Sequence, residues 1–101
     1  VRALAEAELA SGAVTSAIET ARRAIDACTR AENPQMLAMA HATAMECLLA
    51  EAMISRKKEP FEEARFQKEA AIGVLRAHHL DHLIEGVEKR FRKGSSATID
   101  A

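Results

Sequence analysis

The stretch PQMLAMAHATAMECLLAEAMIS, residues 34–55, decides the fold of this chain, because its apolar side chains occupy nearly the whole circumference of a helix. Asn33 precedes it as a favoured N-cap residue, and Pro34 is a favoured first residue of a helix. A helix that is apolar on all sides is buried on several sides. We therefore predict a central helix over residues 34–55 with neighbouring helices on both flanks.

The composition of the whole chain is also that of a helical protein. Of its 101 residues, 49% are hydrophobic and 29% are charged, which is typical of a globular chain. The apolar residues are mostly Ala, Leu, Ile and Met, with three Phe and no Trp or Tyr. Ala, Leu and Met favour helices, whereas strands favour β-branched and aromatic residues. We predict an all-α fold that forms a single domain over residues 1–93.

Four further helices are predicted around the central one. The first covers residues 2–11, and the second covers residues 14–32 with the regular apolar spacing of an amphipathic helix. Pro60 opens a fourth helix, and a fifth covers residues 82–92. Residues 94–101 lack helical patterning and are predicted to form a flexible tail. Because the chain enters helical sequence directly at Val1, we expect it to be a segment of a longer protein.

The segment RAHHLDH, residues 76–82, is predicted to be a joint between the fourth and fifth helices. In one continuous helix the buried stripe that contains Leu75 would continue at His78 and His82. The apolar residues that follow lie roughly 130° around the helix from that stripe, at about 100° per residue. A break at His78-His79 removes the conflict, since His is enriched at left-handed backbone positions, and Asp81 is predicted to cap the fifth helix.

The alternative interpretation of His78, His79 and His82 is a metal site. It needs a continuous helix, which would bring His78 and His82 together at an i,i+4 spacing, and it needs further ligands. The two cysteines, Cys28 and Cys47, are far away in the sequence. A polar turn between helices is therefore the favoured interpretation, and we expect neither a metal nor a cofactor.

Motifs for catalysis are missing from the sequence. It contains no recognisable nucleophile motif, no Gly-rich phosphate loop and no HExxH motif. Glu46 and Glu51 project about 140° apart on the central helix, so they do not form a pair of catalytic carboxylates. Each is expected to reach solvent or to pair with a neighbouring helix. The sequence therefore predicts that the chain is not an enzyme.

Charge and cysteine usage limit the partners and the compartment. A net charge of −1 gives no overall field that attracts nucleic acid or an anionic membrane. Charged and polar residues interrupt the apolar stretch 36–54, which argues against a membrane span. Two cysteines within apolar helical sequence suggest reduced thiols and a cytoplasmic protein. Nucleic-acid contact stays a minor alternative because of one basic run: Lys89, Arg90, Arg92 and Lys93.

Alanines at matching positions suggest a family. Ala17 and Ala24 lie seven residues apart on one helix face after Leu4-Ala5 and Gly12, and Ala64 and Ala71 repeat the spacing. This pattern resembles tetratricopeptide-like repeats, in which such alanines let paired helices cross closely. The spacing of 47 residues from Ala17 to Ala64 exceeds the strict repeat of 34. The chain is thus more similar to the longer repeats in sensor regions of large bacterial transcription regulators and class III adenylate cyclases.

This resemblance implies a right-handed superhelix of about five helices, stacked as antiparallel hairpins. It also implies an adaptor or sensor segment of a bacterial regulatory protein whose concave face binds another protein, a peptide or other domains of the same chain. The alternative from the same residues is a structural helical bundle or a homodimerisation unit.

Overall fold

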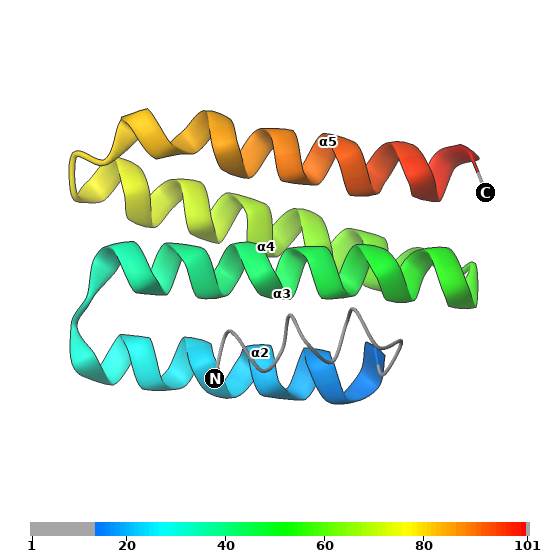
Figure 1. Cartoon of the computed structure of the whole chain (residues 1–101), viewed down its shortest axis with the longest axis horizontal. Helices are drawn as coiled ribbons and strands as arrows, with labels where there is room; N and C mark the ends of the chain where they lie inside the picture. Colours follow the sequence, from blue (N-terminus) through cyan, green and yellow to red (C-terminus); the bar gives the residue numbers. More distant parts are fainter. Residues whose placement is uncertain (1–13, 101) are drawn as a thin grey trace.

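The computed structural model describes residues 14–100, and this part of the chain is helical throughout apart from short connections (Figure 1). The helices are α2 (Val14–Ala31), α3 (Pro34–Ser55), α4 (Lys58–Ala77) and α5 (Ile84–Asp100), with a short 3₁₀ helix, η1 (Asp81–Leu83), before α5. The predicted all-α fold is confirmed. The helix expected over residues 2–11, with Leu4-Ala5 and Gly12, lies outside the described residues.

Consecutive helices run antiparallel (Figure 1), and α3 is in contact with each of the other three α-helices of the described part. It packs against α2, α4 and α5, and α4 also packs against α5. Within residues 14–100, α2 approaches the backbone of α3 but not that of α4 or α5. The apolar circumference of α3 therefore has the neighbours on both flanks that its sequence requires.

Both ends of α3 lie where the sequence places them. The side chain of Asn33 accepts a hydrogen bond from the backbone N–H of Met36 at 3.1 Å, and Pro34 follows as the first helical residue. At the other end Arg56 adopts a left-handed conformation, with φ of 56°, and its N–H donates to the carbonyl of Ala52 at 2.9 Å. This bond closes the helix by the single-bond left-handed motif.

The predicted break at His78-His79 is confirmed. Helix α4 ends at Ala77, and His79 takes a left-handed conformation with φ of 58°. The N–H of Leu80 donates to the carbonyl of Leu75 at 2.7 Å, and that of His79 donates to Arg76 at 3.3 Å. These two bonds form a Schellman motif, which satisfies the last carbonyls of α4 and redirects the chain.

Two predicted helix starts need correction. Asp81 does not cap the fifth helix: it is the first residue of η1, the residue before it is Leu80, no side-chain hydrogen bond caps η1, and α5 begins at Ile84. The Schellman turn delivers the chain directly into η1, so no side-chain cap is required. Helix α4 begins at Lys58 rather than at Pro60. Proline is tolerated there because the first N–H groups of a helix have no intrahelical acceptor.

The fifth helix extends beyond its predicted end at residue 92 and runs to Asp100. Gly94 lies so close to α3 that a Cβ atom on it would stand 2.6 Å from Leu49 Cδ1. Packing against α3 thus continues α5 through a glycine, whose own helix propensity is poor. The flexibility expected of residues 94–101 stays a prediction.

The core consists largely of small side chains. Ten of the nineteen buried apolar residues in the described part are alanines, which lets the helices approach closely. The four alanines of the repeat-like pattern, Ala17, Ala24, Ala64 and Ala71, are all buried, and three of them belong to the main core cluster. The larger core residues come mainly from the central helix and its neighbours: Met45, Leu48, Leu49, Leu75 and Val87.

Candidate interaction site between α3 and α5

A surface pocket of about 280 Å³ lies between α3 and α5. Helix α3 contributes residues spaced by three and four, which lie on one face, and α5 contributes a matching set near its middle. The described lining residues are Glu46, Leu49, Ala50 and Met53 from α3, and Arg90, Lys93 and Gly94 from α5. The pocket is therefore formed by two helices, α3 and α5, that are separated in the sequence by α4.

Gly94 brings the two walls of the pocket together. It faces Leu49, whose side chain is buried, and a Cβ on Gly94 would also stand only 3.3 Å from Leu49 Cβ. By contrast, a Cβ at Gly86 of the same helix would meet nothing within 4 Å. Close approach of backbone to side chain at Gly94 thus fixes where α5 meets α3.

An ion pair forms one edge of the pocket. Arg90 Nη2 donates a hydrogen bond to Glu46 Oε1, and both side chains are largely screened from solvent, at 29% and 35% exposed. This confirms for Glu46 the expectation that it pairs with a neighbouring helix. Met53, which is 39% exposed, and Lys93 line the more open part.

Aromatic contacts hold α5 on its α4 side. The rings of Phe61 and Phe91 lie with their centroids 5.9 Å apart at an interplanar angle of 47°. Lys68 Nζ of α4 lies 4.6 Å from the centroid of Phe91, in a cation–π contact. Helix α5 is thus anchored to α4 by aromatic packing, which leaves its α3 side to form the pocket.

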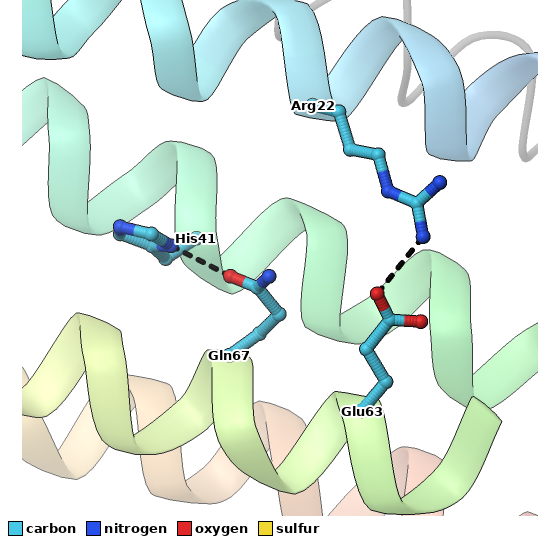
Figure 2. Close-up of polar contacts among 4 residues, drawn as sticks. All are labelled: Arg22, His41, Glu63 and Gln67. Atoms are coloured by element: carbon cyan, nitrogen blue, oxygen red, sulfur yellow. Dashed lines mark hydrogen bonds and ion pairs between the residues drawn. The ribbon is translucent and has the colours of Figure 1, made fainter. Parts of the chain in front are cut away.

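Polar contacts join the helices on another face of the molecule. Figure 2 shows Arg22 of α2 pointing to Glu63 of α4, with Nη2 and Oε1 2.9 Å apart. On the same face His41 Nδ1 of α3 donates to Gln67 Oε1 of α4 at 2.6 Å. The His41–Gln67 contact joins the adjacent helices α3 and α4, and the Arg22–Glu63 pair links α2 to α4, which do not pack against each other. Neither contact suggests chemistry beyond this.

The three histidines of the joint do not form a compact cluster of ligands. His78, His79 and His82 are exposed, and they are spread over the left-handed turn and η1. Within the described residues no group of three or more His, Cys, Asp and Glu side chains is placed to hold a metal ion. His78 instead lines a second pocket of about 410 Å³, at the turn between α2 and α3. The other described lining residues come from this turn and the helix ends beside it: Cys28, Thr29, Glu32, Asn33, Pro34 and Leu37.

The basic run near the middle of α5 is divided by ion pairs rather than continuous. Lys89 pairs with Glu85 one turn earlier, with Nζ and Oε1 4.0 Å apart, and Arg90 pairs with Glu46. Lys93 lines the α3–α5 pocket, and Arg92 is exposed. Two of the four cations are therefore compensated within the chain, and the remainder do not form one uniform basic surface.

Helix α3 is also unusually long and apolar. It is long and apolar enough to cross a membrane, with a mean hydropathy of 1.3, and it is the one described helix that meets this criterion. However, 56% of that apolar window is buried against other helices. The core helix of a folded protein meets the same criterion of length and composition.

Comparisons with protein-family models, with curated proteins and with solved structures found no significant match for this chain. The tetratricopeptide-like resemblance accordingly depends on the residues described above and stays a prediction. The pocket between α3 and α5 and the packing order of the helices are the structural features that bear on function.

Proposed function

We propose that this chain is a protein–protein interaction module, a tetratricopeptide-like adaptor or sensor segment of a larger regulatory protein of the bacterial type. It has no catalysis of its own in this proposal, and it acts in the cytoplasm. Its partner, a protein, a peptide or another domain of the same chain, binds along α3 and α5. The observation that carries the proposal is the pocket that these two helices form.

The packing order of the helices supports stacked hairpins. In an up-and-down four-helix bundle the first and last helices are neighbours. Here α2 does not approach α5, whereas α3 and α5 pack together although α4 separates them in the chain. In a stack of hairpins α3 and α5 are the first helices of successive pairs, and such helices line the binding face of a repeat array.

The volume of the pocket suits a side chain of a bound polypeptide. Its volume of about 280 Å³ lies just below the ~300–1,000 Å³ typical of small-molecule sites. Met53 supplies a flexible, polarisable wall that adapts to different apolar groups. A peptide that inserts one apolar side chain here and lies along the helices makes use of both features.

Homodimerisation is the second candidate function, and exposed apolar residues favour it. Ile54 at the end of α3 is 65% exposed, and Phe66 on α4 is 70% exposed. Single exposed apolar residues are common on monomers, so these two favour a dimer only weakly. Nucleic-acid contact through the end of α5 is the minor alternative, and compensation of Lys89 and Arg90 weakens it.

Selection from a displayed random-peptide library tests the proposal when it is done with a matched pair of variants. Ala50→Arg fills the pocket, whereas Ala27→Arg introduces the same side chain at an exposed position of α2. We expect the unchanged chain and Ala27→Arg to retain the selected peptides and Ala50→Arg to lose them. Peptides that bind all three equally would contradict a site between α3 and α5.

Sedimentation velocity over a range of concentrations separates the dimer from the adaptor. We expect a monomer at all concentrations, for the unchanged chain and for both variants. Two results together would show that the chain is a homodimerisation unit rather than an adaptor. They are a concentration-dependent dimer that Ala50→Arg abolishes and the failure to select any peptide.

A further inference from the structure

Building on the proposed function, we propose that the α3–α5 pocket recognises an acidic segment of a partner protein. An apolar side chain of that segment packs against Met53 beside the Leu49–Gly94 contact, and a neighbouring carboxylate pairs with Lys93. The partner is thus defined by its chemistry: an apolar anchor residue flanked by aspartate or glutamate.

The charges in the pocket favour an acidic ligand. Arg90 and Glu46 form an ion pair and compensate each other. Lys93 adds a positive charge, so the described lining residues carry a net charge of +1, from Arg90 and Lys93 against Glu46. Complementary charge at the rim of an apolar site gives specificity and speeds association.

The surroundings of the pocket carry the same sign. The turn between α3 and α4 contains Arg56 and Lys57, and α4 begins with Lys58; all three are exposed and precede Glu59, the first acidic residue of α4. This turn and the end of α5 lie at the same end of the molecule (Figure 1). A peptide that leaves the pocket in this direction passes a second group of cations, which extends the preference for acidic residues beyond Lys93.

The apolar part of the site sets the anchor. Leu49 and Ala50 form an apolar wall on α3, and Gly94 presents backbone without a side chain on α5. Met53 lies one turn beyond Leu49 on the same face and is partly exposed before any ligand binds. Leu49 is only 2% exposed, so the apolar surface that a bound side chain removes from water belongs mainly to Met53, and its burial contributes to binding.

A nucleic acid fits this site less well than an acidic peptide, although both are anionic. Binding of single strands relies on aromatic side chains on which bases stack. The chain has three Phe and no Trp or Tyr, and none of the three lines the pocket. Phe61 and Phe91 are engaged with each other between α4 and α5, and Phe66 lies on α4.

Two displayed peptide libraries test this inference. Both carry one fixed Leu or Phe anchor among random residues, with flanking positions restricted to Asp and Glu in one library and to Lys and Arg in the other. The unchanged chain is expected to enrich the acidic library at least about tenfold over the basic one. Lys93→Glu is expected to reduce that enrichment by about tenfold and to raise recovery from the basic library, since opposite charges then face each other. Lys89→Glu, on the same helix but outside the pocket lining, is the matched control and is expected to change little.

The outcomes separate this inference from the proposed function. Equal enrichment of the two libraries, with loss of binding in Ala50→Arg, would leave the interaction module standing and overturn the acidic preference. No enrichment from either library would overturn both. Tighter binding of a fluorescent oligo(dT) than of the selected acidic peptides would show that the site binds nucleic acid rather than an acidic peptide. An unchanged preference in Lys93→Glu would remove Lys93 from the site.

Discussion

The two sides of α3 differ in how completely they are filled. Towards α4 the helix is packed against buried side chains, and polar contacts such as His41 to Gln67 join the surface above the interface. Towards α5 the contact includes Gly94 and the Arg90–Glu46 pair, and a pocket opens beside them. One apolar helix therefore supplies both the stable core of the chain and the wall of its candidate binding site.

The largest expected effect compares a residue of the packed core with a residue of the pocket. Leu75→Ala on α4 removes a fully buried side chain and is expected to lower the free energy of unfolding by about 2–5 kcal/mol. Met53→Ala, in the pocket, is expected to lower it by less than about 1 kcal/mol because the side chain is already 39% exposed. Urea denaturation followed by circular dichroism measures both values. Equal losses would show that the α5 side is packed as fully as the α4 side.

The two glycines of α5 give the next largest contrast. Gly94→Ala places a methyl group against Leu49, whereas Gly86→Ala places it in open space. Gly86→Ala is expected to raise the free energy of unfolding by about 0.5–1 kcal/mol through its better helix propensity. Gly94→Ala is expected to be less stable than Gly86→Ala by about 1–3 kcal/mol, the usual cost of overpacking. Thermal and urea unfolding of the two variants test this order, and equal stability would mean that α5 does not approach α3 at Gly94.

The two interhelical ion pairs provide a smaller contrast. The Arg90–Glu46 side chains are 29% and 35% exposed, whereas those of Arg22 and Glu63 are 55% and 42% exposed. Double-mutant cycles are expected to give a coupling of about 1 kcal/mol for the first pair and about 0.3 kcal/mol for the second, because solvent screens the more exposed charges. A larger coupling for Arg22–Glu63 would contradict the expectation that the less exposed pair contributes more to stability.

The smallest expected effect concerns the turn that leads into α5. His79 holds a left-handed conformation that favours glycine. His79→Gly is expected to stabilise the chain by about 0.5 kcal/mol, since relief of backbone strain exceeds the added entropy of the unfolded state. His82→Gly, in η1 at a residue without positive φ, serves as the control and is expected to destabilise it. Differential scanning calorimetry would resolve the two directions, and a loss of stability in both variants would contradict the left-handed turn.

Local signals in the sequence were sufficient for most of the described fold. The N-cap of α3 depends on Asn33 and on the residues that directly follow it. The break at His78-His79 follows from the different helical phase of the apolar residues before and after it. Both features are determined within a few turns of one helix. They could therefore be predicted without knowledge of the tertiary structure.

The pocket could not be predicted in the same way. Glu46 and Arg90 are 44 residues apart, and their pairing depends on which faces of α3 and α5 meet. Gly94 followed by two serines suggests a tail, yet its contact with Leu49 makes it part of a helix interface. A glycine in a polar segment after a basic run gives no local sign of such a contact. The Schellman turn at His79 likewise made the expected cap at Asp81 unnecessary.

The alanine-rich core has a consequence for conformational entropy. An alanine side chain loses almost no rotamer freedom when it is buried, so burial of this core costs little side-chain entropy. Its order depends mainly on the close packing of the helix backbones. Long side chains that remain free to sample several rotamers are concentrated at the surface, and Met53 and Lys93 of the pocket are among them. A ligand that orders these two loses about 0.5–1.5 kcal/mol for each. The association that results from so small a site is expected to be weak and rapidly reversible, with the rigid alanine core unchanged beneath it.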